Sequence, residues 1–325
     1  MGQLGLFPLL EHLPRRACLI AFNYHRIGHP DNAAYDRGVI EATPEQFEFQ
    51  MGWLKRNFDV VRLEEAQEMI EDPRRLRHAH VLITFDDGYR DNYDLAFPIL
   101  RDLGVPATFF LPTRFIGSHH LPWWDRAADL VRRASRRPVV LSYPRHLEVP
   151  GGTEASIQKV LGLYKDPATT DQARFLLELE QACGVSCGDS ADERVFLSWD
   201  EAREMLRGGM SFGSHSHSHE ILARMSPDEQ RHELSLSRAT LQKELGIAAE
   251  AFAYPVGAAS TFNSATQAAL LEAGYRVAFS YRGGANLAGE MSRFDVQRTR
   301  VGTDLNDDQF RLRTLCLAVA GRPWV

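Results

Sequence analysis

Short apolar runs alternate with helical patterns along most of this 325-residue chain. The helical patterns begin at capping residues or end at glycines, as where Pro44 follows Thr43 at a predicted helix start. Repeated strand–helix units predict an α/β fold with a parallel sheet or barrel. In chain order, strands are expected at 18–24, 59–63, 81–85, 106–111, 210–212, 251–254, 276–280 and 295–298, and helices at 44–57, 64–70, 92–103, 227–245, 262–273 and 305–320.

The strand–helix rhythm breaks between about residues 113 and 193. This stretch holds Trp123 and Trp124, a helical pattern at 170–182 and a run of arginines between 132 and 137. It is too rich in aliphatic and aromatic residues for a plain linker, so we expect a single domain over 1–325 with an insertion at about 113–193. The arginines are interpreted as a solvated helix face, with an anionic substrate site as the alternative.

The composition narrows the possible partners. Hydrophobic residues make up 44% of the chain and charged residues 25%, as in an ordinary globular protein. The net charge of −6 argues against nucleic acid and anionic membranes as partners. No apolar stretch approaches the roughly 20 residues that a transmembrane helix needs. We therefore expect neither a nucleic-acid partner nor a transmembrane segment.

The first 14 residues bear on localisation. Their apolar core is short and no Lys or Arg precedes it, which argues against a secretory signal. The expectation is a cytoplasmic protein, with a periplasmic or extracellular one as the alternative if the chain has been trimmed.

Asp86 and Asp87 follow the apolar run 81–83 and directly precede Gly88. The run reads as a buried parallel strand, and adjacent residues at its end point in opposite directions. Two neighbouring carboxylates repel each other unless a cation lies beside them, and a metal ion is the simplest such cation. The alternative is an Asp-Asp-Gly turn that caps a helix.

His215 and His219 are four residues apart, with His217 between them. This spacing predicts both imidazoles on one face of a helix or helical turn, as two ligands of one metal require. His217 has a supporting role or none. The alternative to a metal site is that the three histidines form a histidine-rich tract at the surface. Two imidazoles and one carboxylate suit Zn²⁺, Fe²⁺, Co²⁺ or Ni²⁺, which make hydroxide available near neutral pH. The remaining carboxylate is then free to act as a general base.

Two of these motifs resemble those of a known family. Thr84–Gly88 reads TFDDG and 215–219 reads HSHSH, as in the polysaccharide deacetylases of the NodB-homology group, carbohydrate esterase family 4. The resemblance implies that Asp86 is the catalytic base and that Asp87, His215 and His219 bind one divalent metal, with Zn²⁺ preferred. It also implies a distorted, often incomplete (β/α) barrel.

The third family motif, Arg-Pro-Pro-Tyr, is altered here. The equivalent stretch 252–257 has Ala253 and Val256 in place of the arginine and the tyrosine. The backbone N–H of Val256 can still stabilise an oxyanion. The missing arginine normally holds the base, and Arg298 is our candidate to replace it. An ordinary surface arginine is the alternative.

The late Leu-x-His motif of the family, which supplies the general acid, is absent, and no histidine follows His232. His25, at the end of the first expected strand, resembles the acid histidine of the poly-N-acetylglucosamine deacetylase branch. We therefore assign His25 as the general acid. A strand-capping or substrate-binding histidine is the alternative.

Four aromatic residues are candidates for stacking on a sugar ring. They are Tyr89, Trp123, Trp124 and Tyr254, with core packing as the commoner fate of the tryptophan pair. The resulting expectation is a metal-dependent N-deacetylase of an N-acetylated saccharide, either a polymer or a biosynthetic precursor. A hydrolase of a non-sugar amide or formamide and a non-catalytic binding protein on the same fold remain as alternatives.

Overall fold

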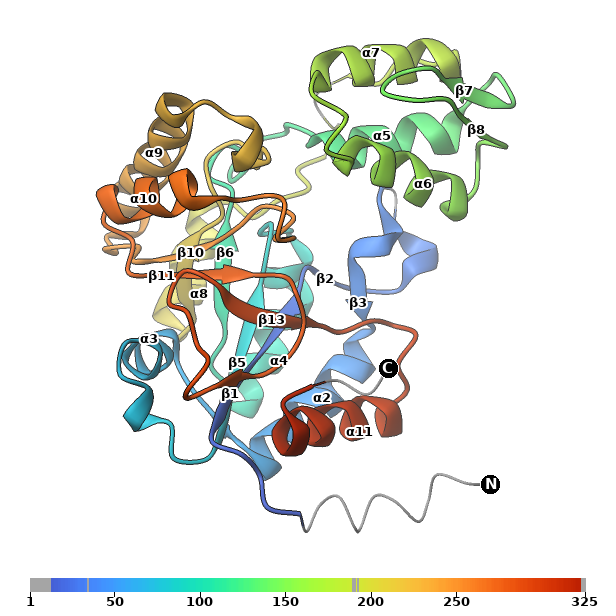
Figure 1. The fold of residues 1–325 in the computed structure, drawn as a ribbon. Helices are drawn as coiled ribbons and strands as arrows, with labels where there is room; N and C mark the ends of the chain where they lie inside the picture. The colour runs from blue at the N-terminus through green and yellow to red at the C-terminus, as the bar shows by residue number, and fades with distance from the viewer. Residues whose placement is uncertain (1–12, 34, 189–190, 192, 323–325) are drawn as a thin grey trace. The chain divides into compact units, whose positions relative to one another are not determined.

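Seven parallel strands close into a barrel in the computed structural model (Figure 1), which describes residues 13–322 except 34, 189–190 and 192. The closure comes from β1 and β5, which pair along their whole length from Cys18↔Ala79 to Tyr24↔Phe85. The barrel strands are β1 (Cys18–Tyr24), β5 (Ala79–Phe85), β6 (Thr108–Leu111), β9 (Ser211–Ser214), β10 (Ala251–Ala253), β11 (Val277–Ser280) and β13 (Val296–Arg300). The predicted distorted (β/α) barrel is therefore confirmed.

Two short strands extend this sheet. β12 (Asn286–Leu287) pairs antiparallel with the start of β1. β4 (Asp59–Val60) pairs with the first half of β5, and β6 pairs with its last two residues. Because β1 occupies one edge of β5 throughout, β4 and β6 must share the other edge, at opposite ends of the barrel.

Helices surround the barrel, and several begin where the sequence predicts. Thr43 and Gln46 form a capping box at the start of α2, with Pro44 in the first turn. The helices of this unit are α2 (Pro44–Asn57), α3 (Leu63–Glu71), α4 (Phe97–Leu103), α8 (Trp199–Arg207), α9 (Pro227–Leu245), α10 (Ser264–Glu272) and α11 (Asp307–Ala320). Two expectations need correction. The strand expected at 59–63 ends at Val60, and the helix expected at 92–103 begins as a π-helix, η4 (Asn92–Ala96).

Apolar side chains fill the barrel interior. Leu82 of β5 and Phe110 of β6 belong to one buried cluster with residues of β1, β10, β11 and β13. Alternation along β5 therefore directs Leu82, Thr84 and Asp86 to the inside. The barrel interior is therefore a packed apolar core, and polar side chains such as Asp86 lie at the carboxyl ends of its strands.

The chain divides into two compact units. The barrel unit comprises residues 1–28, 40–117 and 196–325, and the second unit comprises residues 29–39 and 118–195. The longer piece of the second unit overlaps the insertion expected at about 113–193. Nothing in the sequence of residues 29–39 indicated that they belong to the same unit.

The second unit has its own secondary structure and core. Trp123 stacks on Tyr164 with ring centroids 3.9 Å apart, and the Tyr164 ring meets Phe175 edge-on. Its elements are α5 (Trp123–Arg133), α6 (Glu154–Lys165), α7 (Gln172–Cys183) and the hairpin of β7 (Val139–Leu141) and β8 (Leu147–Val149).

Among the described residues, no helix combines the length and apolar character needed to cross a bilayer. Most of the N-terminal segment considered for a signal, residues 1–12, lies outside the described part of the chain.

Candidate metal and catalytic centre

The candidate site lies at the carboxyl ends of the barrel strands. Asp86 and Asp87 follow β5, His215 follows β9, and His25 follows β1. In parallel barrels these strand ends meet on one face, where loops can vary without disturbing the core. The fold thus brings together the residues that the two motifs single out.

Asp87, His215 and His219 converge on one point. The carboxylate Oδ1 of Asp87 lies 3.6 Å from Nε2 of His215 and 3.3 Å from Nε2 of His219. All three side chains are buried, and their ligand atoms lie within 4.8 Å of one another. Two imidazole nitrogens and one carboxylate oxygen are a donor set that Zn²⁺ and similar ions accept. Asp87, His215 and His219, the candidate metal triad, therefore fit a divalent metal ion.

The protonation of the triad also suits a metal. The Nδ1 atom of His215 hydrogen-bonds to the backbone carbonyl of Ala253 at 2.8 Å, which leaves Nε2 with its lone pair directed at the group. Burial, the largest effect, lowers the pKa of His215 to about 4, so its imidazole is neutral at neutral pH. Burial raises the pKa of Asp87, but the partnership with His219 outweighs it and lowers the pKa overall.

The loop that carries the two histidines is not helical, which corrects the expectation drawn from their spacing. Ser216 and His219 adopt positive φ angles of 63° and 60°, and these bends bring the two imidazole rings to 4.7 Å between centroids. The intervening His217 turns elsewhere and hydrogen-bonds through Nδ1 to Thr113 at 2.9 Å. A spacing of four residues thus brings two imidazoles together without a helix.

Glu233, on α9, anchors this loop. Its Oε2 accepts hydrogen bonds from the backbone N–H groups of His217 at 3.0 Å and Ser218 at 2.8 Å. Within the loop, Ser216 Oγ accepts the N–H of His219 at 3.0 Å. No sequence signal marked Glu233, because an acidic residue on an amphipathic helix is ordinary.

Glu233→Ala is expected to lower the affinity for Zn²⁺ by about 10–100-fold, because the two freed N–H groups no longer fix the loop between the ligands. Calorimetric titration with Zn²⁺ measures the change. Glu233→Gln keeps one acceptor oxygen and should lose less. Equal affinities for the wild type and Glu233→Ala would show that the loop holds its shape without this anchor.

Asp86 lies between the triad and a buried arginine. Arg298 of β13 is fully buried and donates two hydrogen bonds, from Nη1 to Oδ1 at 2.6 Å and from Nη2 to Oδ2 at 2.7 Å. Asn23 donates a third bond to Oδ2 at 3.0 Å. Burial raises the pKa of Asp86, but the charge and the hydrogen bonds of Arg298 outweigh it and hold the pKa well below the usual range. Asp86 is therefore an ionised, oriented carboxylate.

His25 is paired with a buried glutamate that the sequence analysis missed. Glu41, on β3 (Ile40–Ala42), lies 2.8 Å from Nδ1 of His25 and also accepts its backbone N–H at 2.7 Å. Burial lowers the pKa of His25, but Glu41 outweighs it, and with Asp87 and Asp86 the pKa rises to about 9. The imidazole is therefore protonated at neutral pH, and its Nδ1 is occupied by Glu41.

Unusual backbone conformations gather at this site. Among the described residues, the non-glycine positions with positive φ are Asp87, Ser216 and His219 of the candidate site, Val256, which follows β10, and Ala249. Val256 has a φ of 63°, which is rare for a β-branched residue. Such strain concentrates where the surrounding structure fixes a functional geometry.

The four aromatic candidates are buried. Tyr89 stacks on Phe196 with centroids 4.9 Å apart, and Tyr254 stacks on Phe262 at 3.9 Å. Trp123 and Trp124 are buried within the second unit. Burial of all four rings favours the core-packing alternative over sugar stacking.

A barrel with an Asp-Asp pair and two histidines at its strand ends is the arrangement of a class of metal-dependent hydrolases. The sequence profile of one family matches this chain. The profile, described as "Polysaccharide deacetylase", matches residues 74–143 and 172–278, which is more than half of the chain. This protein belongs to the polysaccharide deacetylase family.

Individual relatives agree with this assignment. The chain is 32% identical over 109 residues to the poly-beta-1,6-N-acetyl-D-glucosamine N-deacetylase of Staphylococcus epidermidis, which covers 30% of this chain and 37% of that protein. The matched segment thus spans well under half of that relative's own length.

Two solved structures share the fold over nearly their whole length. The deacetylase PplD of Streptococcus pyogenes has a TM-score of 0.59 and 20% identity, covering 92% of this chain and 98% of that one. IcaB of Ammonifex degensii has a TM-score of 0.57 and 18% identity, covering 93% and 97%.

Proposed function

We propose that this protein is a metal-dependent N-deacetylase that hydrolyses the acetamido group of an N-acetylated saccharide to an amine and acetate. The observation that carries the proposal is the placement of Asp86, fixed by Arg298, beside a buried group of one carboxylate and two imidazoles. The family and the printed activity of the Staphylococcus epidermidis relative support the choice of substrate.

Asp87, His215 and His219 would hold the metal, with Zn²⁺ preferred over Co²⁺, Ni²⁺ or Fe²⁺. When bound, such an ion lowers the pKa of a water molecule and polarises the acetamido carbonyl. The other steps belong to the side chains and backbone of this chain.

Asp86 removes the proton of the attacking water, and Arg298 and Asn23 keep its carboxylate ionised and oriented. The N–H of Val256 donates a hydrogen bond to the oxyanion of the tetrahedral intermediate. His25 then transfers a proton from Nε2 to the departing amine while Glu41 holds Nδ1. Water is consumed, and the C–N bond breaks to give acetate and a free amino sugar.

The general-acid assignment predicts a specific pH effect for Glu41→Gln. The acid must carry its proton, so activity falls as pH rises through the pKa of His25. Without the Glu41 charge, burial lowers that pKa, and the alkaline limb of kcat/KM should move to lower pH by about one unit or more.

A pH profile of acetate release measures this shift. Asp91→Asn is the matched control, because Asp91 accepts hydrogen bonds from Arg26 and Ile27 of β2 (Arg26–Ile27), the strand that directly follows His25. An alkaline limb that stays in place in Glu41→Gln would remove His25 from the role of acid.

A substrate panel tests the proposed function itself. Zinc-loaded protein should release acetate from N-acetylglucosamine oligomers much faster than it hydrolyses simple amides or formamides. The reverse preference would favour the non-sugar amide hydrolase. Zinc binding without hydrolysis of any substrate in the panel would favour the non-catalytic alternative.

A further inference from the structure

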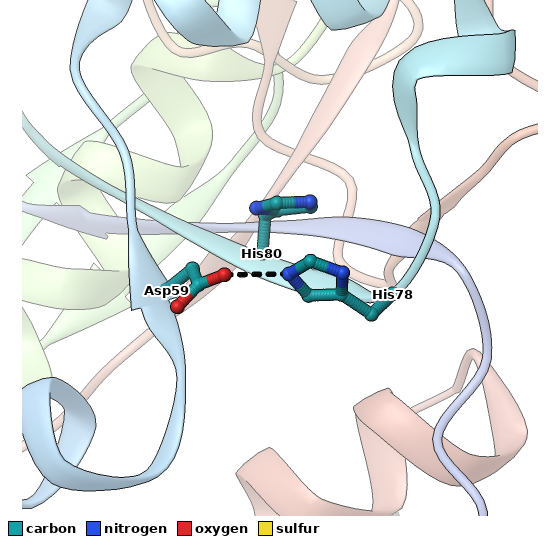
Figure 2. A group of neighbouring side chains, drawn as sticks. All are labelled: Asp59, His78 and His80. Atoms are coloured by element: carbon teal, nitrogen blue, oxygen red, sulfur yellow. Dashed lines mark hydrogen bonds and ion pairs between the residues drawn. The ribbon is translucent and has the colours of Figure 1, made fainter.

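A second group of metal-ligand side chains lies at the opposite end of the barrel. Asp59, His78 and His80 come together there (Figure 2), where β4 pairs with the start of β5. His80 lies near the start of β5 and six residues before Asp86, which directly follows that strand, and six extended residues correspond to about 20 Å. The group is therefore separate from the candidate catalytic centre.

Strand register explains why Asp59 and His80 meet. Asp59 of β4 is the direct partner of His80 on β5, so the two side chains leave the sheet on the same face. His78 lies in the bend directly before β5, and its ring pairs with the Asp59 carboxylate. Backbone pairing thus brings Asp59 to His80, and the bend that leads into β5 places His78 beside them.

The distances suit a single ion. One ligand atom from each residue lies within 4.8 Å of the others, and Nε2 of His78 is 2.5 Å from Oδ2 of Asp59. The ring centroids of His78 and His80 lie 4.2 Å apart, with the ring planes tilted by 33°. Tetrahedral zinc needs ligand atoms about 3.3 Å from one another, which small rotations of the exposed Asp59 and His78 side chains can supply.

His80 provides the independent observation that points to a ligand. It is only 6% exposed, and neither of its ring nitrogens has a hydrogen-bond partner among the described residues. Buried polar atoms normally have partners, and a metal ion would satisfy one of these nitrogens.

We propose that Asp59, His78 and His80 form a second metal site, which takes Zn²⁺ or a similar divalent ion and ties β4 to β5. Two imidazoles and one carboxylate match the preference of such ions, and the exposure of Asp59 and His78 leaves room for water as a further ligand. The site is structural, because it lies about 20 Å along β5 from the base.

Zinc stoichiometry, measured on the 325-residue chain without a histidine tag, tests this proposal. After chelator treatment and titration with Zn²⁺ alone, the wild type should bind two ions per chain. His78→Ala and Asp59→Asn should each bind one, and His219→Ala should also bind one. His146→Ala is the matched control, an exposed histidine of the second unit, and should still bind two.

Thermal unfolding distinguishes the two sites. In the His219→Ala background, Zn²⁺ should raise the Tm by several degrees, and the added His78→Ala change should abolish that rise. One ion per wild-type chain, lost in His219→Ala, would overturn the proposal and leave Asp59 and His78 as a surface ion pair. Two ions that persist in both His78→Ala and Asp59→Asn would overturn it as well.

Discussion

Replacing Asp86 with asparagine is expected to lower kcat for acetate release by about 10³-fold, within the range attributed to a positioned general base. Asparagine has nearly the same shape but cannot accept the proton of the attacking water. Steady-state kinetics on an N-acetylglucosamine oligomer measure the effect, with zinc-loaded wild type as the reference. The expected loss lies in kcat, since Asp86 acts on the reacting water rather than on the bound sugar.

Metal content separates this effect from loss of the metal. Asp86→Asn should still bind zinc at the triad, whereas Asp87→Asn should lose affinity because the proposal assigns a ligand oxygen to Asp87. An Asp86→Asn protein that retains zinc and most of its activity would exclude Asp86 as the base.

The second large effect is expected on stability. Arg298→Met should lower the free energy of unfolding at neutral pH by about 3–5 kcal/mol, because it leaves the buried Asp86 carboxylate without its charged partner. Denaturant unfolding of the metal-free protein measures the loss. Arg282→Met is the matched control, since Arg282 pairs with Asp295 at the surface, where such pairs contribute about 0–1 kcal/mol.

The stability loss should depend on pH with a defined sign. In the wild type the pKa of Asp86 is held below its unfolded value of about 3.9. Its contribution to stability is therefore fully present above that pH and is lost as pH falls towards the folded pKa. The gap between wild type and Arg298→Met should narrow in acid. An equal loss for Arg282→Met and Arg298→Met at neutral pH would contradict the account.

Much of the barrel could be predicted from the sequence. The strand at Cys18–Tyr24 and the helices at Pro44–Asn57 and Pro227–Leu245 match their predicted limits, because each carries a clear apolar pattern or cap. α8 was missed, although Ser198 and Glu201 form a capping box at its start. The π-helical turn at Asn92–Ala96 depends on tertiary packing, which no local pattern encodes.

At the candidate site, the sequence singled out the central side chains better than the residues that support them. The two motifs contain Asp86, Asp87, His215 and His219, which stand out by residue type and spacing. Glu41 lies 16 residues from its partner His25, and such a distant contact leaves no local pattern. Arg298 was a candidate only because the third family motif lacks its arginine, and the structure places it against Asp86. Positive φ at Ser216 and His219 overrode the helical interpretation of the histidine spacing.

The central claim is metal-dependent deacetylation with Asp86 as the base. The most direct test is acetate release from N-acetylglucosamine oligomers by chelator-treated protein before and after addition of Zn²⁺, in the wild type, Asp86→Asn and His219→Ala. The account predicts no release without metal, recovery in the wild type on adding one equivalent or more, and little recovery in either variant. Full activity in chelated protein, or equal recovery in His219→Ala, would contradict it.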